Sequence, residues 1–141
     1  MRRTLALAVL LALLSACAGE DEQPSAEELA RAWSRALNAG DNRAAGALFA
    51  IGAQIEQSGF VLRVRMPEDA AVWTASLPCA GRIVAVEHEG EDAIATFLLS
   101  DRQTSRCDAP GGRAKALFRV RDGKIVLFRQ LPLNTSPEDA V

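Results

Sequence analysis

The chain has 141 residues, of which 49% are hydrophobic and 24% are charged, and its formal net charge at pH 7 is −2. Nucleic-acid-binding domains normally present a strongly basic face, so this composition argues against a nucleic-acid partner. The length suits one domain with one core, and no internal repeat or low-complexity tract divides the sequence.

The N-terminus has the pattern of a secretory signal peptide. Arg2 and Arg3 precede an unbroken apolar run over residues 5–14. Such a run is too short to span a bilayer as a mature helix, which takes about 20 residues. A basic start, a short apolar middle and small residues at the end indicate a segment that is removed during export. We therefore predict a signal peptide over residues 1–16.

The last four residues of this segment, Leu14-Ser15-Ala16-Cys17, resemble a bacterial lipobox. In such signals the peptidase cuts before the cysteine, whose sulfur carries diacylglycerol, and acyl chains such as palmitate anchor the protein. Two or three chains give stable anchoring where one chain would be marginal. We expect Cys17 to be lipidated; the alternative is an ordinary signal peptide cut near Ala18, with Cys17 discarded.

The segment that follows is small, acidic and ends in a proline, which is typical of a solvated tether. We predict a tether over residues 17–24, one folded domain over residues 25–133 and a disordered tail over residues 134–141. The expected location is the extracytoplasmic face of the cell membrane, to which the lipid anchor binds the protein.

Two cysteines remain after Cys17, at positions 79 and 107. Thiols outside the cytoplasm tend to pair, so we predict a disulfide between Cys79 and Cys107. The alternative is a reactive or metal-binding pair. The chain has one histidine and no CxxC motif, which argues against a metal site. We expect neither a metal nor a cofactor.

The first predicted helix begins at a capping box. The Ser25 side chain can accept a hydrogen bond from the Glu28 amide, and the Glu28 carboxylate can accept one from the Ser25 amide. Apolar residues then recur every four positions on one face, at Leu29, Trp33 and Leu37. Gly40 is predicted to end the helix.

Two shorter helices are predicted next. Asp41 can cap a helix that buries Ala45, Leu48 and Phe49. Pro67 suits the first turn of a third helix, which is predicted to end before Pro78.

The rest of the domain reads as strands. Alternating or apolar runs bounded by turn residues predict six strands, at 54–57, 60–66, 81–88, 93–100, 113–121 and 124–131. Asp122-Gly123 between the last two is a strong hairpin signal. The last strand is apolar on both faces, which indicates either a central strand of a covered sheet or a subunit interface.

The order of these elements and several motifs resemble the nuclear transport factor 2-like superfamily, also called SnoaL-like. The likeness is carried by residues 33–41 and 47–49 (WSRALNAGD and ALF) and by residues 118–126 (FRVRDGKIV). Residues 77–84 and 105–108 also look like an actinobacterial branch of small secreted members. The resemblance implies an α+β, cystatin-like fold: a curved, mostly antiparallel sheet wrapped as a cone around about three N-terminal helices. It also implies an apolar pocket, and a homodimer through the outer sheet face.

The fold class does not decide between catalysis and binding, because this superfold hosts both. Family isomerases use a carboxylate base with a tyrosine, and family dehydratases use histidine–aspartate pairs. This chain has no tyrosine. Its only catalytic candidates are His88, beside an acidic turn, and Asp101, which precedes an arginine; a surface role is the simpler interpretation of both.

The pocket candidates are the aromatic residues of the predicted core and one arginine within the apolar last strand: Trp33, Phe49, Trp73, Phe118 and Arg129. Plain core packing is the alternative for each aromatic residue, and a dimer contact is the alternative for Arg129. The leading hypothesis is a non-catalytic lipoprotein domain that binds a small apolar ligand or a partner protein. The alternatives are a SnoaL-like isomerase or hydrolase and a dimerising scaffold with no ligand.

Overall fold

The computed structural model describes residues 22–133. The predicted signal peptide, Cys17 and the tail at 134–141 lie outside the described residues. Within residues 22–133, no helix combines the length and the apolar character that a membrane crossing requires.

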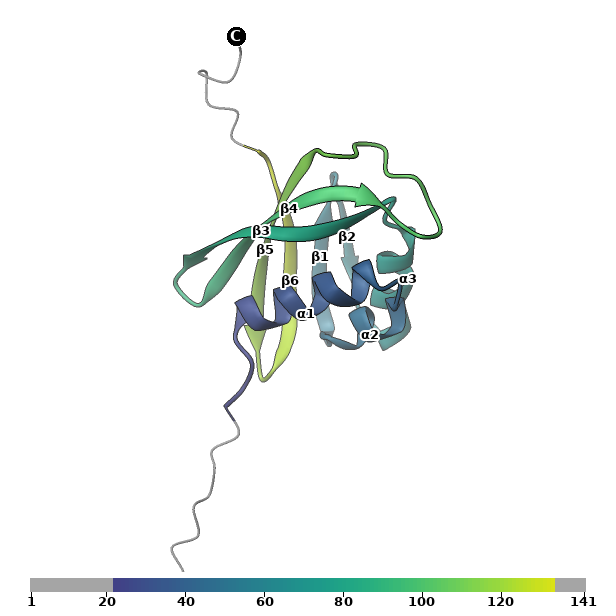
Figure 1. Ribbon diagram of the computed structural model, residues 1–141. Helices are drawn as coiled ribbons and strands as arrows, with labels where there is room; N and C mark the ends of the chain where they lie inside the picture. The colour runs from purple at the N-terminus through teal and green to yellow at the C-terminus, as the bar shows by residue number, and fades with distance from the viewer. Residues whose placement is uncertain (1–21, 134–141) are drawn as a thin grey trace, which may run out of the picture.

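The described residues form three helices and one mixed six-stranded sheet (Figure 1). The helices are α1 (Ala26–Asn38), α2 (Asn42–Ala47) and α3 (Pro67–Ser76). The strands are β1 (Phe49–Gln57), β2 (Phe60–Arg63), β3 (Cys79–Glu89), β4 (Asp92–Asp101), β5 (Arg113–Arg121) and β6 (Lys124–Leu131).

The sheet order is β2-β1-β6-β5-β4-β3, and every neighbouring pair is antiparallel except β1 and β6. The sheet curves around α1, which lies across its inner face, while α2 and α3 gather at one end of α1 (Figure 1). The predicted α+β class and the predicted curved sheet with three helices are confirmed.

Helix α1 begins as the capping box predicts. The Glu28 amide donates to Ser25 Oγ over 3.1 Å, and the Ser25 amide donates to the Glu28 carboxylate over 2.7 Å. The predicted apolar stripe is buried against the sheet: Leu29, Trp33 and Leu37. The stripe therefore fixes which face of α1 points into the cone.

The structure corrects the prediction that Phe49 belongs to the second helix. Helix α2 ends at Ala47, and Phe49 is the first residue of β1, where it pairs with Ile125 of β6. A register irregularity follows, and Gly52 within it has φ +86°. This bulge interrupts the alternation of apolar residues, which explains why only the last four residues of β1 could be predicted as strand.

Strand β2 is shorter than predicted and ends at Arg63. Beyond it, the amides of Arg65 and Met66 donate to the Asp69 carboxylate at 2.8 and 3.1 Å. Asp69 therefore draws this segment into the start of α3 and away from the sheet.

Strand β6 lies between β1 and β5 and is thus central, which confirms one of the two interpretations of its apolar faces. The hairpin before it turns at Asp122 and Gly123, whose φ values of 50° and 72° suit a tight two-residue turn. Phe128 points into the cone, and Leu127 on the outer side is also buried, with 8% of its surface exposed.

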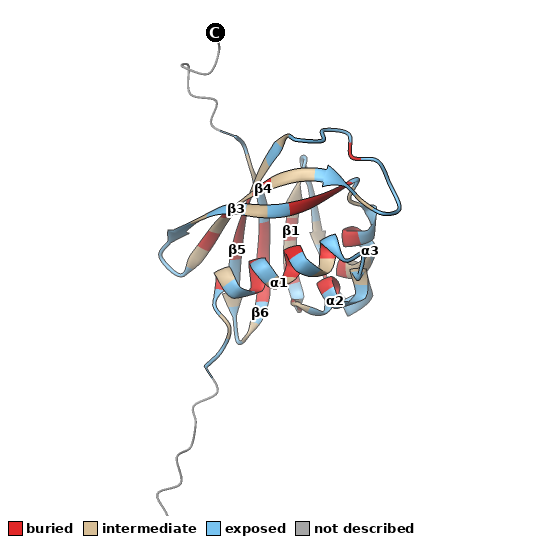
Figure 2. Ribbon diagram, viewed as in Figure 1, coloured by how far each residue is buried: buried red, intermediate tan, exposed pale blue. Residues whose placement is uncertain are grey.

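Aromatic side chains fill the inside of the cone. Trp33 of α1 stacks on Trp73 of α3, with ring centroids 5.7 Å apart. Phe97, Phe118 and Phe128 surround Trp33 at centroid distances of 5.5 to 5.9 Å. Buried positions gather on the inner face of the strands and on the facing side of α1 (Figure 2). One core therefore holds the helices and the sheet together.

Candidate functional site

A cavity of about 420 Å³ opens at the end of the cone where β3 and β5 begin. Its apolar wall comes from α1, the residue after α3 and three strands: Trp33, Leu37, Leu77, Phe97, Leu99, Ala114, Ala116 and Phe128. Phe60 of β2 also lines the cavity and is 47% exposed. The cavity lies beside the aromatic core, whose Trp33, Phe97 and Phe128 rings belong to its wall.

Most polar side chains of the cavity wall form hydrogen bonds with one another or with neighbouring core groups. Gln57 accepts the indole N–H of Trp73 over 2.9 Å. The Ser58 hydroxyl donates to Gln130 Oε1 over 3.3 Å, and the Ser76 hydroxyl donates to the Trp73 carbonyl over 2.6 Å. These bonds engage the side-chain oxygens of Gln57 and Gln130 and the hydroxyl groups of Ser58 and Ser76.

Asp108 supplies the one carboxylate among the described residues that line this cavity. Lys115 is also part of the wall, but its ammonium group lies 3.6 Å from Glu87. Glu87 and Lys115 stand opposite Ile94 and Thr96 on the outer face of the sheet. The Lys115 charge is therefore paired with Glu87 on the outer face of the sheet.

Helix α1 holds one wall of the cavity through Gly81 of β3. The Ser34 hydroxyl and the Asn38 amide both donate to the Gly81 carbonyl, at 2.7 and 3.1 Å, and the Gly81 amide donates to Asn38 Oδ1 over 2.9 Å. A Cβ atom at position 81 would lie 3.2 Å from the Phe97 ring. Because glycine has no Cβ, the β3 backbone can pack against both the α1 side chains and the Phe97 ring at this position.

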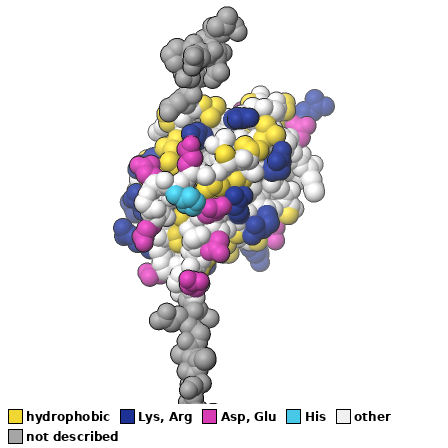
Figure 3. Space-filling view, turned by 60° about the vertical axis from the view of Figure 1, so that its left-hand side comes forward, with side chains coloured by type: hydrophobic (Ala, Val, Ile, Leu, Met, Phe, Trp, Pro, Cys, Tyr) yellow, Lys and Arg dark blue, Asp and Glu magenta, His cyan; other side chains and the backbone are white. Residues whose placement is uncertain are grey.

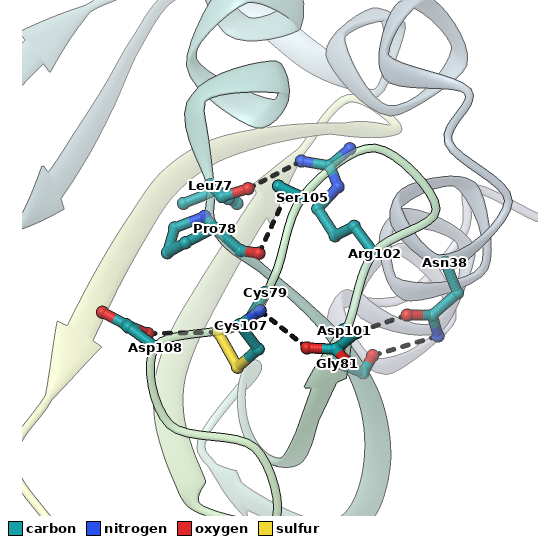
Figure 4. Close-up of a disulfide and its surroundings, with 10 residues drawn as sticks. All are labelled: Asn38, Leu77, Pro78, Cys79, Gly81, Asp101, Arg102, Ser105, Cys107 and Asp108. Carbon is teal, nitrogen blue, oxygen red and sulfur yellow. Dashed lines mark hydrogen bonds between the residues drawn. A yellow bond between two sulfur atoms is a disulfide. The ribbon is translucent and has the colours of Figure 1, made fainter.

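The predicted disulfide between Cys79 and Cys107 is present and ties the β4–β5 loop to the start of β3 (Figure 4). Arg102 of the same loop donates to the carbonyls of Thr74 and Leu77 at 2.7 and 2.9 Å. The Ser105 hydroxyl donates to the Pro78 carbonyl over 3.0 Å. The loop that carries Asp108 is therefore fixed against the end of α3.

Cys79, Cys107 and Asp108 place their ligand atoms within 4.8 Å of one another. The bond between the two sulfurs removes both thiolates, so this group cannot bind a metal as a Cys–Cys–Asp set. Asp108 Oδ1 lies 3.2 Å from Cys79 Sγ. Because a disulfide sulfur carries no proton, this contact is not a hydrogen bond from the sulfur.

The two catalytic candidates lie away from the cavity wall. His88 is exposed, and its Nε2 lies 2.9 Å from Glu27, which also accepts a bond from Arg31. Figure 3 shows the one histidine on the surface among acidic and basic side chains. The hydrogen bond from Arg31 is the main cause that lowers the pKa of Glu27. Asp101 accepts the Cys107 amide over 2.8 Å and so helps to hold the loop.

The pocket candidates divide into three groups. Trp33 lines the cavity. Phe49, Trp73 and Phe118 are buried in the core and are not part of the cavity wall. Arg129 lies on the exposed side of the sheet, where it binds Glu56 of β1 through its Nε and Nη2 atoms. This pairing lowers the pKa of Glu56, chiefly through the hydrogen bond from Arg129.

Sequence reasoning missed the polar wall residues Gln57, Ser58, Asp108 and Gln130. They come from three segments that are far apart in the chain, and no local pattern marks them. Only the β1–β6 pairing, which is parallel and bulged, brings the ends of β1 and β6 together. A correct strand register would have been needed to find them.

No protein-family model matches the chain, and no curated protein matches it. Solved structures match its fold. An NTF2-like protein of unknown function from Cytophaga hutchinsonii is 14% identical, with a TM-score of 0.63 and coverage of 79% of this chain and 92% of the other. A cystatin-fold protein from Novosphingobium aromaticivorans is 17% identical, with a TM-score of 0.60 and coverage of 77% and 99%.

A third structure has a ketosteroid isomerase-like fold and comes from Catenulispora acidiphila, in complex with trimethylamine. It is 19% identical, with a TM-score of 0.57 and coverage of 82% of this chain and 90% of the other. At these identities the likeness concerns the fold alone. On the evidence of its strand order, its helices and these neighbours, the chain has the nuclear transport factor 2-like fold.

Proposed function

We propose that this protein is a lipid-anchored binding domain outside the cytoplasm that holds a small, mainly apolar molecule in the cavity over its aromatic core. The observation that carries the proposal is the cavity wall itself: apolar side chains line it, and its one carboxylate has no histidine or tyrosine beside it. General acid–base catalysis needs positioned proton donors and acceptors, and this wall supplies no pair of them.

The size of the cavity also supports this function. Small-molecule sites commonly measure about 300 to 1,000 Å³ and combine apolar walls with a few polar groups. The cavity of about 420 Å³ is within that range. The Catenulispora acidiphila neighbour is described in complex with a small molecule, which is consistent with ligand binding by this fold.

The test is native mass spectrometry of residues 18–141, purified from an oxidising compartment. The core lies entirely in the described residues, so this chain retains the fold. We expect a co-purifying molecule that leaves on denaturation. Ala114→Leu fills the cavity from β5 and should abolish this retention, while Val72→Leu on the exposed side of α3 should not. A bare protein of the calculated mass would count against the carrier and favour a partner-binding domain.

The anchor is tested separately in the full chain. Wild-type protein should incorporate labelled palmitate, and Cys17→Ser should not. The Cys79→Ala/Cys107→Ala variant keeps Cys17 and serves as the matched control, which should still be labelled. Loss of label from the control, or label on Cys17→Ser, would contradict an anchor at Cys17.

A further inference from the structure

The side-chain amide of Gln57 is held in one orientation at the cavity wall. The Trp73 indole N–H, which can only donate, bonds to Gln57 Oε1 over 2.9 Å. The other end of the amide is therefore the nitrogen, Nε2. Within residues 22–133, no oxygen accepts a hydrogen bond from this nitrogen.

Gln57 points to the inner side of the sheet, where the cavity lies. Ile55, two residues earlier on β1, is buried in the core, whereas Glu56 between them pairs with Arg129 on the outer face. Gln57 lines the cavity and is partly buried. Its Nε2 atom is accessible, because Trp33 Nε1 is the one buried side-chain nitrogen or oxygen atom without a partner in residues 22–133. An accessible, unpaired donor thus stands on the cavity side of β1.

A second amide stands next to the first. The parallel pairing of β1 and β6 sets Glu56 beside Arg129, and the next residues of the two strands are Gln57 and Gln130. Gln130 is exposed, lines the same cavity and accepts the Ser58 hydroxyl through Oε1 over 3.3 Å. Its Nε2 also has no acceptor in the described part of the chain. Because neighbouring strands lie only about 4.8 Å apart, one oxygen atom between the two amides can accept from both.

Building on the proposed function, we propose that Gln57 Nε2 and Gln130 Nε2 donate together to an oxygen of the ligand, which is an uncharged, mainly apolar molecule with a carbonyl group. A carbonyl oxygen has two lone pairs and can accept both bonds. The apolar wall suits the hydrocarbon part of such a molecule. An anionic ligand is disfavoured, because Asp108 adds a negative charge to the wall and the Lys115 ammonium pairs with Glu87.

The bond to Trp73 makes Gln57 a donor that is already ordered before the ligand arrives. Binding therefore costs little side-chain entropy at this position. A ligand with the carbonyl oxygen replaces the water that it displaces from the two amides. A hydrocarbon of the same shape displaces that water and leaves the donors unpaired, so the amides select against it.

A matched pair of rigid probes isolates this difference: adamantan-2-one, and 2-methylideneadamantane, in which a CH₂ group replaces the carbonyl oxygen. Each is titrated into ¹⁵N-labelled residues 18–141, and the side-chain amide signals are followed by NMR. Adamantan-2-one should bind about tenfold more tightly and should shift the Gln57 NH₂ signals, which Gln57→Glu assigns by their loss. Adamantane-1-carboxylate should bind more weakly than the ketone; tighter binding would overturn the uncharged ligand class.

Gln57→Glu removes the donor and keeps an acceptor for the Trp73 indole, whose unchanged N–H signal reports an intact core. In this variant the ratio of the ketone affinity to the hydrocarbon affinity should fall from about tenfold to about one. The ratio cancels the effect of the added charge on both probes. Gln103→Glu, exposed in the β4–β5 loop and outside the cavity wall, makes the same change of charge and should keep the wild-type ratio.

Equal affinities in the wild-type chain, or a ratio that Gln57→Glu leaves unchanged, would overturn the role of the two amides and leave the cavity function intact. Binding of neither probe to the wild-type chain would also overturn this inference. The proposed function fails with it only where native mass spectrometry finds the bare protein, so the two failures are distinguishable.

Discussion

The backbone of Gly81 in β3 makes three hydrogen bonds with α1 side chains: its carbonyl accepts two and its amide donates one. Its carbonyl has two donors, Ser34 and Asn38, but its amide has one side-chain acceptor, Asn38 Oδ1. Loss of Asn38 therefore leaves the amide unpaired at a partly buried site, whereas loss of Ser34 leaves the carbonyl with a donor.

Asn38→Ala should lower the free energy of unfolding by about 1–3 kcal/mol, the usual cost of an unsatisfied buried group. Ser34→Ala should cost about 1 kcal/mol, because Asn38 still serves the Gly81 carbonyl. Urea denaturation of both variants measures the difference. A Ser34→Ala cost equal to or above that of Asn38→Ala would contradict this account.

The Glu56–Arg129 pair on the outer face of the sheet makes stability depend on pH. The hydrogen bond from Arg129 lowers the pKa of Glu56 in the folded chain. Near and below the pKa of an unfolded glutamate, about 4.3, the unfolded state therefore binds more protons than the folded state. The free energy of unfolding accordingly decreases as the pH is lowered. The contribution of the pair is full above that pH and is lost as the pH falls through the folded-state pKa.

Glu56→Gln should unfold at a lower urea concentration than the wild-type chain at pH 6, and the gap should narrow towards pH 3. Arg129 is exposed and Glu56 is partly exposed to solvent, so the effect should be small and should shrink in high salt. Glu68→Gln on α3, which makes no ion pair within the described part of the chain, is the control. A gap that is the same at both pH values would show that the pair does not stabilise the fold through its charge.

At the scale of elements, the disulfide attaches the β4–β5 loop to the start of β3, so the bond and the loop act together. The bond joins residues 28 positions apart, and a loop of this length is stabilised by about 3–4 kcal/mol in the chain-entropy model. The loop also shapes one side of the cavity, because Cys79 and Asp108 both line it. Loss of the bond should therefore affect stability and binding together.

Cys79→Ala/Cys107→Ala should lower the free energy of unfolding by about 2–5 kcal/mol and weaken retention of the ligand. Arg102 still bonds to the carbonyls of Thr74 and Leu77, so the loop should stay near α3 rather than detach. Arg102→Lys in the same background should release it further. Unchanged ligand retention in the triple variant would show that the loop does not shape the binding site.

The sequence predicted the elements whose signals are local and missed those set by pairing. The capping box at Ser25, the Leu29–Trp33–Leu37 stripe and the Asp122-Gly123 turn each act within a few residues, and each is confirmed. The start of β1 was missed because its bulge at Gly52 breaks the period, and its pairing with β6 is parallel and distant in sequence. The cavity shares this difficulty: Trp33 could be named as a candidate, but the polar wall residues beside it come from segments that only the strand pairing brings together.

For the whole molecule, Gln23 and Pro24, the last residues of the predicted tether, and the cavity lie at opposite ends of the strands. Gln23 and Pro24 lie beside His88 at the end of β3 and beside Gly123 after β5. The cavity is lined by the first residues of the same two strands, Cys79 and Ala114 among them. Seven residues separate Cys17 from Ser25, and even fully extended they reach only about 25 Å.

In the lipid-anchored protein we therefore expect the cavity mouth to face away from the membrane, because the anchor enters at the other end of the domain. Ligand would then exchange with the aqueous phase and not with the bilayer. Equilibrium dialysis at equal free concentration should give the same affinity for the co-purified molecule whether the full lipidated chain is held in vesicles or residues 18–141 are in solution. A flexible Gly/Ser insertion after Cys17 should change nothing, since the mouth is already clear of the surface. If anchoring weakened binding and the insertion restored it, the mouth would have to lie against the lipid, and the opposed arrangement of tether and cavity would be wrong for the anchored protein.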